Sequence, residues 1–311
     1  MKKHLIPLLI ILALGLIGIK SLFHSGLYTA HDIWHQVARL HHYYQSVLAG
    51  QFPPYWVGNL AHGLGYPLFF FSYHLPWLIG LPFLLIGFTI PLTIKLLFIL
   101  SFLFSGFALY FLLFEITNSK LSGLLSALIY LYLPLHLRTI LVSAAMGVAW
   151  TYVFVPLFIF GLWRLYHSPK SRSGFALVSF ATAGLILSHL ISIPAISLLL
   201  LPLFLFLFST IKKNYQKTFF IKSLLAILTG LGISAFYLIP AIYYQQFTKV
   251  ANSSLTKLYQ TGFPDLKQLL YSPWGYGIIG NDIKSASLSF QLGIVQWLAI
   301  IFSLIFIVLS V

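Results

Sequence analysis

Long apolar segments alternate with short polar stretches along almost the whole chain. Most of these segments reach the roughly 18 residues that a helix needs to cross about 30 Å of hydrocarbon. They comprise residues 5–23, 67–88, 91–114, 121–137, 139–163, 174–190, 192–210, 219–243 and 291–311. The pattern predicts an all-α, polytopic transmembrane protein with eight or nine apolar segments, in which residues 1–311 form a single transmembrane domain.

The composition excludes a soluble globular protein. Of the 311 residues, 59% are hydrophobic and 7% are charged, against about 25% charged residues in soluble domains. The net charge of +14 would suit a nucleic acid, but many of the basic residues cluster at the ends of apolar segments, as in cytoplasmic loops. We therefore interpret the charge as topology and expect no nucleic acid partner. The chain has no cysteine, which excludes disulfides and thiolate metal sites.

Basic clusters predict the orientation of the segments. One cluster precedes residues 174–210 and another follows them, and both are expected on the cytoplasmic side. Residues 174–210 are therefore predicted to form a hairpin whose tip, near Ser188 and His189, faces outside. Residues 24–66 and 245–289 are predicted to be the first and second external loops. The clusters consist of Arg164, Lys170 and Arg172, and of Lys212, Lys213 and Lys217.

The residues at the two ends of the chain support two further predictions. Lys2 and Lys3 precede the first apolar segment, and no small-residue cleavage site follows it. We therefore expect an uncleaved first span with a cytoplasmic N-terminus. The last segment runs to Val311 without a flanking charge, so we expect the chain to be the N-terminal part of a longer protein.

The number of crossings conflicts with this orientation unless one segment does not cross. Four full crossings between residues 24–66 and the basic cluster that starts at Arg164 would place that cluster outside. Residues 67–88 are the best candidate for a re-entrant or interfacial segment, because their three prolines interrupt helical hydrogen bonding. A fused segment over residues 121–163 is the alternative.

The first external loop has the pattern of an amphipathic helix. Thr29 and Asp32 resemble a capping box, which predicts a helix from Ala30 to Gly50. Helical spacing places apolar and polar side chains on different faces, as in a helix that lies along a membrane surface. The apolar face comprises Ile33, Val37, Leu40, Tyr44 and Val47, and the polar face comprises Asp32, His35, Arg39 and His42.

Asp32 is the strongest candidate for chemistry in this loop. It is the only acidic residue among the first 114 positions, and a carboxylate so placed is a candidate general base. The other interpretation is that it only caps the helix. His31 and His35 have the spacing of a zinc-binding helix, but no spacing selects a third ligand among His62, His74 and His189. No metal and no cofactor are therefore indicated, although a divalent metal stays possible.

Aromatic and turn residues near the two loops allow two interpretations each. Residues 52–56 are aromatic and proline-rich, and they precede Tyr66. They form either an aromatic belt at the membrane interface or a wall that contacts a sugar ring or polyprenyl phosphate. Arg138 lies between two apolar segments and either binds phosphate or anchors the chain at the interface. The second loop either covers the cavity or only connects spans; its polar and aromatic residues are Asp265, Tyr271, Trp274, Tyr276 and Asp282.

Several motifs of the first loop carry a family resemblance. They are Asp32, Arg39, the run GQFPPYW at residues 50–56, NLA at 59–61, Gly63, GYPLF at 65–69 and Pro76. With weaker matches at residues 133–137, 187–189 and 234–241, the chain resembles bacterial membrane proteins described as 6-pyruvoyl-tetrahydropterin-synthase-related. These in turn resemble the glycosyltransferase-C superfamily. Nothing in the residues resembles a soluble pterin enzyme.

The resemblance implies a function at the outer face of the bacterial cytoplasmic membrane. Superfamily members use an acidic residue close after the first span as the base that activates an acceptor, and the donor is usually a polyprenyl-phosphate sugar. Asp32 matches that acid, whereas a second acid, frequent in the first loop of members, is missing here. We expect transfer of a sugar to an extracytoplasmic acceptor, with a lipid-linked sugar and membrane lipids as partners. The candidate substrate-binding residues are His35, Arg39, His62, Tyr66, Arg138 and His189.

Two alternatives stay open. A transporter or flippase of lipid-linked glycans would use the same polar cavity without catalysis, and an assembly subunit would use neither. The sequence does not address the oligomeric state.

Overall fold

The computed structural model describes residues 2–249, 263–277 and 288–310. Within these ranges the chain is helical and has no strand beyond an isolated bridge between Val57 and Tyr66. The helices are α1 (Leu5–Gly18), α2 (Ile33–Leu48), α3 (Leu68–Phe71), α4 (Leu75–Leu85), α5 (Ile90–Thr117), α6 (Lys120–Leu131), α7 (Pro134–Leu141), α8 (Met146–His167), α9 (Arg172–His189), α10 (Ile193–Thr210), α11 (Lys213–Ile233), α12 (Ala235–Tyr244), α13 (Leu266–Leu270) and α14 (Ile294–Ser310).

The predicted all-α membrane architecture is confirmed, but the predicted number of spans is not. Four stretches in the described ranges are long and apolar enough to cross a membrane, and the pair α6 and α7, bent by 48°, would make a fifth. The helices α1, α4 and α14 are apolar but shorter. The four stretches are Ile90–Thr117, Met146–His167, Arg172–Thr210 and Lys213–Ile233.

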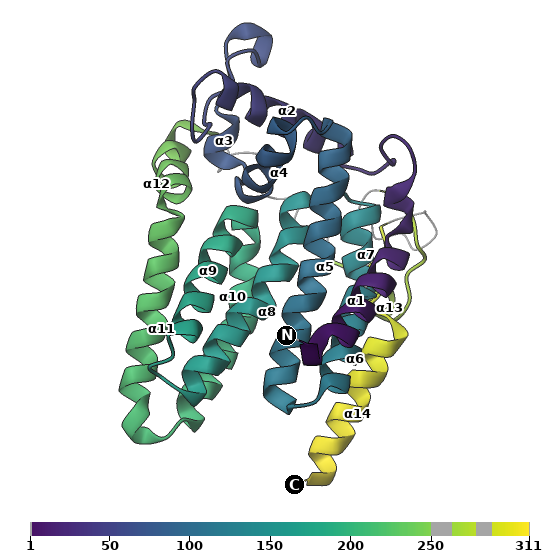
Figure 1. The fold of residues 1–311 in the computed structure, drawn as a ribbon, viewed down its shortest axis with the longest axis vertical. Coiled ribbons are helices and arrows are strands. Elements are labelled where there is room, and N and C mark those ends of the chain that lie inside the picture. Colours follow the sequence, from purple (N-terminus) through teal and green to yellow (C-terminus); the bar gives the residue numbers. More distant parts are fainter. Residues whose placement is uncertain (1, 250–262, 278–287, 311) are drawn as a thin grey trace.

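The stretch Arg172–Thr210 consists of two helices that meet at a turn. A short 3-10 segment, Leu190–Ser192, separates α9 from α10. Side chains of both helices line one cavity, and the ring of Phe204 on α10 stacks on that of Phe219 on α11 at 5.4 Å. α9, α10 and α11 therefore run side by side in the bundle (Figure 1).

Glycines bring α8 and α9 into close contact. A Cβ atom added at Gly161 would lie 2.7 Å from the backbone nitrogen of Val178, and one added at Gly184 would lie 2.3 Å from the Phe154 ring. Small residues at such positions let helix backbones approach closely within a membrane. This pair forms the most extensive helix contact of the described bundle.

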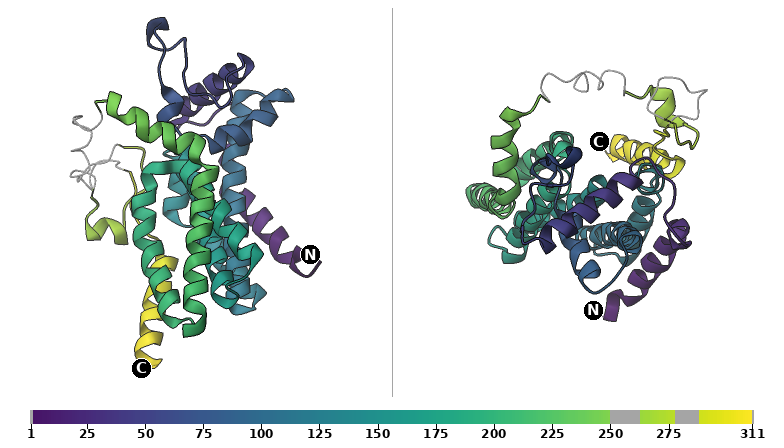
Figure 2. Two further views of the ribbon diagram at one scale, coloured as in Figure 1. Left: turned by 90° about the vertical axis from the view of Figure 1, so that its left-hand side faces the viewer. Right: turned by 90° about the horizontal axis from the view of Figure 1, so that it is seen from above.

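Several helix ends lie together at one end of the bundle, where an ion pair and ring contacts connect them. Arg164, near the end of α8, binds Glu115, near the end of α5, through two hydrogen bonds of 2.8 Å. His4 contacts Tyr110 of α5 with its Nδ1 atom 2.8 Å from the hydroxyl. α2, α3 and α4 lie at the opposite end (Figures 1 and 2).

α2 differs from its prediction in two ways. It begins at Ile33, not Ala30, because the backbone N–H groups of His31 and Asp32 donate to the carbonyls of Val142 and Ser143 and not within a helix. Its apolar face packs on α4 and α5, and Ile33 and Leu40 are buried in the protein core. A position along the membrane surface is therefore not confirmed for this helix.

Residues 67–88 form the short helices α3 and α4. α4 has 11 residues, which span about 16 Å at 1.5 Å per residue, so it is too short to cross a membrane. This agrees with the prediction that this segment does not cross. α6, α7 and α8 are separate helices, so the alternative of one fused segment over residues 121–163 is wrong.

Candidate functional site

A polar cavity of about 550 Å³ lies beneath α2, at the end of the bundle away from the Glu115–Arg164 pair. Its walls come from α2, from the segment around α3, from the start of α8, from the turn after α9 and from α12. It is lined by Asp32, Gln36, Arg39, Tyr66, Pro67, Leu68, Phe71, Ser72, Tyr73, Ala145, Gly147, Val148, His189, Leu190, Ile191, Tyr237, Ala241, Ile242, Gln245 and Thr248.

Asp32 presents a free carboxylate to this cavity. It occupies the N-cap position of α2, yet its side chain accepts no capping hydrogen bond. Within the part of the chain that the structure describes, no cation lies within 4.0 Å of its carboxylate. Capping therefore does not explain this residue, and its two oxygens are available to a ligand.

Arg39 lies two helical turns further along the same wall. Its Nη1 atom donates to the hydroxyl of Tyr73 at 3.3 Å and, more weakly, to Oε1 of Gln36 at 3.5 Å, and its guanidinium lies over the Tyr73 ring at 5.6 Å. No carboxylate among the described residues pairs with it. Arginine suits planar recognition of phosphate or carboxylate groups, so this guanidinium is a candidate anion contact.

The Gln36 side chain holds the part of the cavity wall that lies between Asp32 and Arg39. It is fully buried; its Nε2 donates to the Ala144 carbonyl at 2.8 Å, and its Oε1 accepts from the Tyr73 hydroxyl at 2.8 Å. Ala144 has a left-handed backbone with φ of 49°, which is unfavourable for alanine. Burial raises the pKa of Tyr73, although Arg39 opposes this shift, so the phenol stays neutral and donates.

The first turn of α8 contributes its backbone to the cavity wall, where the Met146 N–H already donates to the Ala144 carbonyl. Gly147 and Val148 line it, and the N–H of Gly147 lies against the Tyr73 hydroxyl. The first N–H groups of a helix lack partners within the helix and carry partial positive charge. Ser72, which is 9% exposed, lines the same cavity with a buried hydroxyl that has no partner among the described residues. The Val148 N–H, the Ser72 hydroxyl and Arg39 suit an anion.

His189 and the aromatic side chains complete the walls. The Nδ1 atom of His189 lies 2.6 Å from the Ser192 hydroxyl, so the turn after α9 orients this imidazole. The Tyr237 hydroxyl donates to the Phe71 carbonyl at 3.2 Å, and that of Tyr55 donates to the Phe236 carbonyl at 2.6 Å. These two bonds attach α12 to the first loop and to α3.

His74, the residue before α4, connects that helix to three other elements behind the cavity. Its N–H donates to the Leu187 carbonyl of α9, its ring accepts from Tyr43 of α2 at 3.2 Å, and its other ring nitrogen donates to the Phe69 carbonyl of α3 at 2.8 Å. Burial lowers the pKa of His74 to about 4, and the bond to Phe69 offsets part of that shift. The neutral ring is therefore a structural connector.

The structure brings four of the seven predicted site residues together. Asp32, Arg39, Tyr66 and His189 line the cavity. His35 and His62 are exposed and do not line it.

Arg138 lies on α7 outside the cavity, where it donates to the Ser289 carbonyl at 2.7 Å and lies over the Phe290 ring at 5.2 Å. Its position favours the anchoring interpretation over a shared phosphate site.

Sequence reasoning missed several lining residues, of which Gln36, Ser72 and Tyr73 matter most for the charges. Gln36 had a detectable signal, since residues 32, 36 and 39 follow helical spacing. Ser72 and Tyr73 had none, because their place depends on how α3 meets α8.

The described residues do not assemble a metal site. No group of three histidine, aspartate or glutamate side chains comes together there. The Nε2 atom of His31 lies 2.8 Å from the Tyr276 carbonyl, so the start of the first loop contacts the second. Tyr276 and Trp274 line a separate cavity near Ser21 and Tyr28. Asp282 lies outside the described residues.

Comparisons with known proteins place the chain in a family. A family model described as 6-pyruvoyl-tetrahydropterin synthase related domain, membrane protein, matches residues 70–308. A protein of Lactococcus lactis subsp. cremoris (strain MG1363), itself uncharacterised, is 27% identical over 241 residues, which make up 75% of this chain and 39% of that relative. The chain thus spans well under half of the relative's length. No solved structure matches.

The matched range begins after α2, so Asp32 and Arg39 precede it while Tyr73, Gly147 and His189 fall within it. The comparisons do not test the resemblance to the glycosyltransferase-C superfamily, which stays a prediction. Because the model covers well over half of the chain, the chain belongs to the 6-pyruvoyl-tetrahydropterin synthase related family of membrane proteins.

Proposed function

We propose that this protein transfers a sugar from a polyprenyl-phosphate donor to an acceptor hydroxyl. The observation that carries the proposal is that one cavity is lined by two charged side chains, those of Asp32 and Arg39, and that neither forms an ion pair among the described residues. Asp32 and Arg39 line it from the same side of α2. Seven residues correspond to roughly 10 Å along the helix and to nearly two full turns, so a sugar ring fits between the carboxylate and the guanidinium.

The proposed step is a displacement at the anomeric carbon. The Asp32 carboxylate accepts the proton of the acceptor hydroxyl, and the hydroxyl oxygen forms the new bond to the anomeric carbon. The bond from that carbon to the phosphate oxygen breaks, and the polyprenyl phosphate leaves with the electron pair. Arg39, the Val148 N–H and Ser72 stabilise the charge on the leaving phosphate. Base and leaving group lie on opposite sides of the sugar, as an inverting displacement requires.

We further propose that the cavity faces the outside of the bacterial cytoplasmic membrane. Arg164 and Lys170 lie at the opposite end of the bundle from α2, as do Lys212 and Lys213. The cytoplasmic preference of lysine and arginine then places the N-terminus inside. With α4 too short to cross, the crossings between residues 24–66 and Arg164 agree with this orientation.

Reconstitution with a labelled polyprenyl-phosphate sugar tests the proposal. Asp32→Asn keeps the shape of the side chain and removes the base, and it breaks no cap. We expect sugar transfer to fall by about 10²- to 10⁴-fold, with binding of the donor retained. Asp265→Asn is the matched control, because Asp265 caps α13 outside the cavity. Unchanged turnover in Asp32→Asn would remove this carboxylate as the base.

The same experiment separates transfer from transport. A transporter or flippase of lipid-linked glycans would move the labelled lipid across the vesicle membrane and give no transfer with any donor. Asp32→Asn would then alter transport only. Translocation without transfer would thus favour that function over ours.

A further inference from the structure

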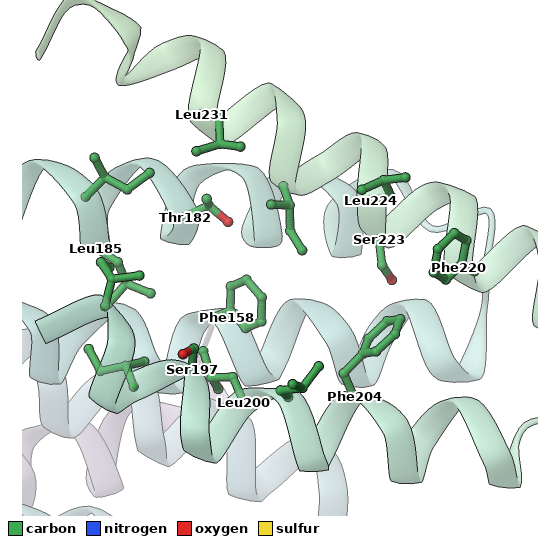
Figure 3. A pocket seen from close by; sticks show the side chains of 15 residues that line it. Phe158, Thr182, Leu185, Ser197, Leu200, Phe204, Phe220, Ser223, Leu224 and Leu231 are labelled. Carbon is green, nitrogen blue, oxygen red and sulfur yellow. The ribbon is translucent and has the colours of Figure 1, made fainter. Parts of the chain in front are cut away.

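A second cavity of about 400 Å³ lies between α10 and α11, with α8 and α9 as its floor (Figure 3). Its lining is almost wholly apolar, and it includes the rings of Phe158, Phe204 and Phe220, which point into it (Figure 3). We call it the apolar groove. Most of its lining residues belong to the candidate spans Arg172–Thr210 and Lys213–Ile233, so the groove lies at hydrocarbon depth.

The groove exists because α11 is held at two separate levels. Near its end, Gly230 packs so closely on α9 that an added Cβ would lie 2.5 Å from Thr182. Near its start, Phe219 stacks on Phe204 of α10. Between these two contacts α11 stays apart from α10, and Phe158 of α8 forms the base of the gap between them.

The apolar groove and the polar cavity lie on either side of the turn between α9 and α10. Leu190 and Ile191 line the polar cavity, whereas Ile186 and Ile193, on either side of that turn, line the groove. From Ile193 to Phe204 the groove follows α10 for roughly 16 Å, at 1.5 Å per residue. A molecule with a polar head and a long hydrocarbon chain that passes this turn would reach both spaces.

One polar group in the groove lacks a partner. Ser223 is 1% exposed, and its hydroxyl has no hydrogen-bond partner among the described residues. The other two hydroxyl side chains, Thr182 and Ser197, donate to carbonyls of their own helices. The Ser223 hydroxyl is therefore, among the described residues, an unused hydrogen-bond donor in the wall of the groove.

We propose that the apolar groove binds the unsaturated hydrocarbon chain of the lipid phosphate whose head group occupies the polar cavity. This inference rests on the proposed function for the identity of the head group. It assigns α10 and α11, which lie outside the polar cavity, to recognition of the lipid. The groove then fixes the depth of the lipid, and the phosphate lies near the turn after α9.

A photoactivatable polyprenyl phosphate with a diazirine in mid-chain tests this assignment. We expect it to label α10 and α11 of the reconstituted protein. Leu200→Trp fills the groove and should reduce both labelling and binding at least tenfold. Leu198→Trp is the matched control, since Leu198 lies two residues away and is 79% exposed; it should behave as the wild type. Ser197→Phe adds bulk from a more exposed position and serves as a second filling variant.

A short-chain phosphate separates the groove from the head-group site, because it should bind the wild type and Leu200→Trp equally. Labelling that is unchanged in both filling variants would overturn the proposal. So would equal displacement of the probe by saturated phosphatidylglycerol. If α10 and α11 are labelled but no sugar is transferred, the groove stands and the proposed function fails. If Asp32→Asn abolishes transfer while the label falls elsewhere, the groove alone fails.

Discussion

Gln36 determines the shape of the polar cavity more than either charged residue beside it. Its amide joins α2 to the Ala144 carbonyl before α8 and to the Tyr73 hydroxyl after α3. Tyr73 in turn accepts from Arg39. One buried amide therefore holds three segments and aims the guanidinium, although it bears no charge and needs no contact with substrate.

Replacing Gln36 by leucine should disorder this wall. The variant keeps the approximate volume but removes one of the two hydrogen bonds that the Ala144 carbonyl accepts, and it leaves the Tyr73 O–H without its acceptor. A buried donor left unsatisfied costs about 1–3 kcal/mol. We expect a lower melting temperature and at least tenfold weaker binding of a short-chain polyprenyl phosphate. Gln45→Leu, on the exposed face of the same helix, is the control. Equal binding by both variants would contradict a positioning role for Gln36.

Among the elements, the α9–α11 layer shows how single glycines set helix spacing. Gly230 and Gly232 both belong to α11 and lie two residues apart. A Cβ at Gly230 would meet the Ser179 carbonyl at 2.6 Å, whereas one at Gly232 would meet nothing within 4 Å. The first glycine thus allows close packing on α9, and the second has no such role.

Alanine at these two positions should have opposite effects. Gly230→Ala forces α11 away from α9, and such overpacking costs typically about 1–3 kcal/mol. Gly232→Ala removes only backbone freedom and should be neutral or stabilising by up to about 1 kcal/mol. Thermal unfolding in detergent measures both. A loss of stability in Gly232→Ala as large as that in Gly230→Ala would refute the packing argument.

The sequence predicted elements well where one physical signal dominated. Apolar length located α5, α8, α9, α10 and α11, and helical spacing located α2 with its polar residues Asp32 and Arg39. It did not predict the start of α2, since Asp32 bonds to Ser143 from a distant part of the chain. Nor did it predict that His35 lies outside the cavity while Gln36 lines it. The polar face of a helix includes side chains that point in several directions. Tertiary packing decides which of these side chains line the cavity.

At the scale of the whole molecule, charge and cavity lie at opposite ends. The Glu115–Arg164 pair and the turn before α11 mark the basic end, and α2 marks the other (Figure 1). Because residues 1–311 contain no cysteine, they are a suitable background for mapping which end faces which compartment.

Single cysteines should therefore report the orientation directly. We expect a membrane-impermeant maleimide to label Gly58→Cys, in the exposed first loop, on intact cells. Ser168→Cys, in the exposed turn between α8 and α9, should react only after permeabilisation. The reverse pattern would place the cavity in the cytoplasm and exclude an extracytoplasmic acceptor. The cysteine-free parent controls for background labelling.

Asp32 and Arg39 share one helix, while His189, Tyr237 and Gln245 belong to the helices on the other side of the cavity. A rigid tilt of α2 would widen or narrow the entrance without changing the spacing between its carboxylate and its guanidinium. The width of the entrance, which limits the ligands that are admitted, can therefore change without changing the distance between the Asp32 carboxylate and the Arg39 guanidinium. The width can change through α12, which two phenolic hydrogen bonds and ring contacts such as Phe70–Tyr244 tie to the first loop and α3, while the distance stays the same.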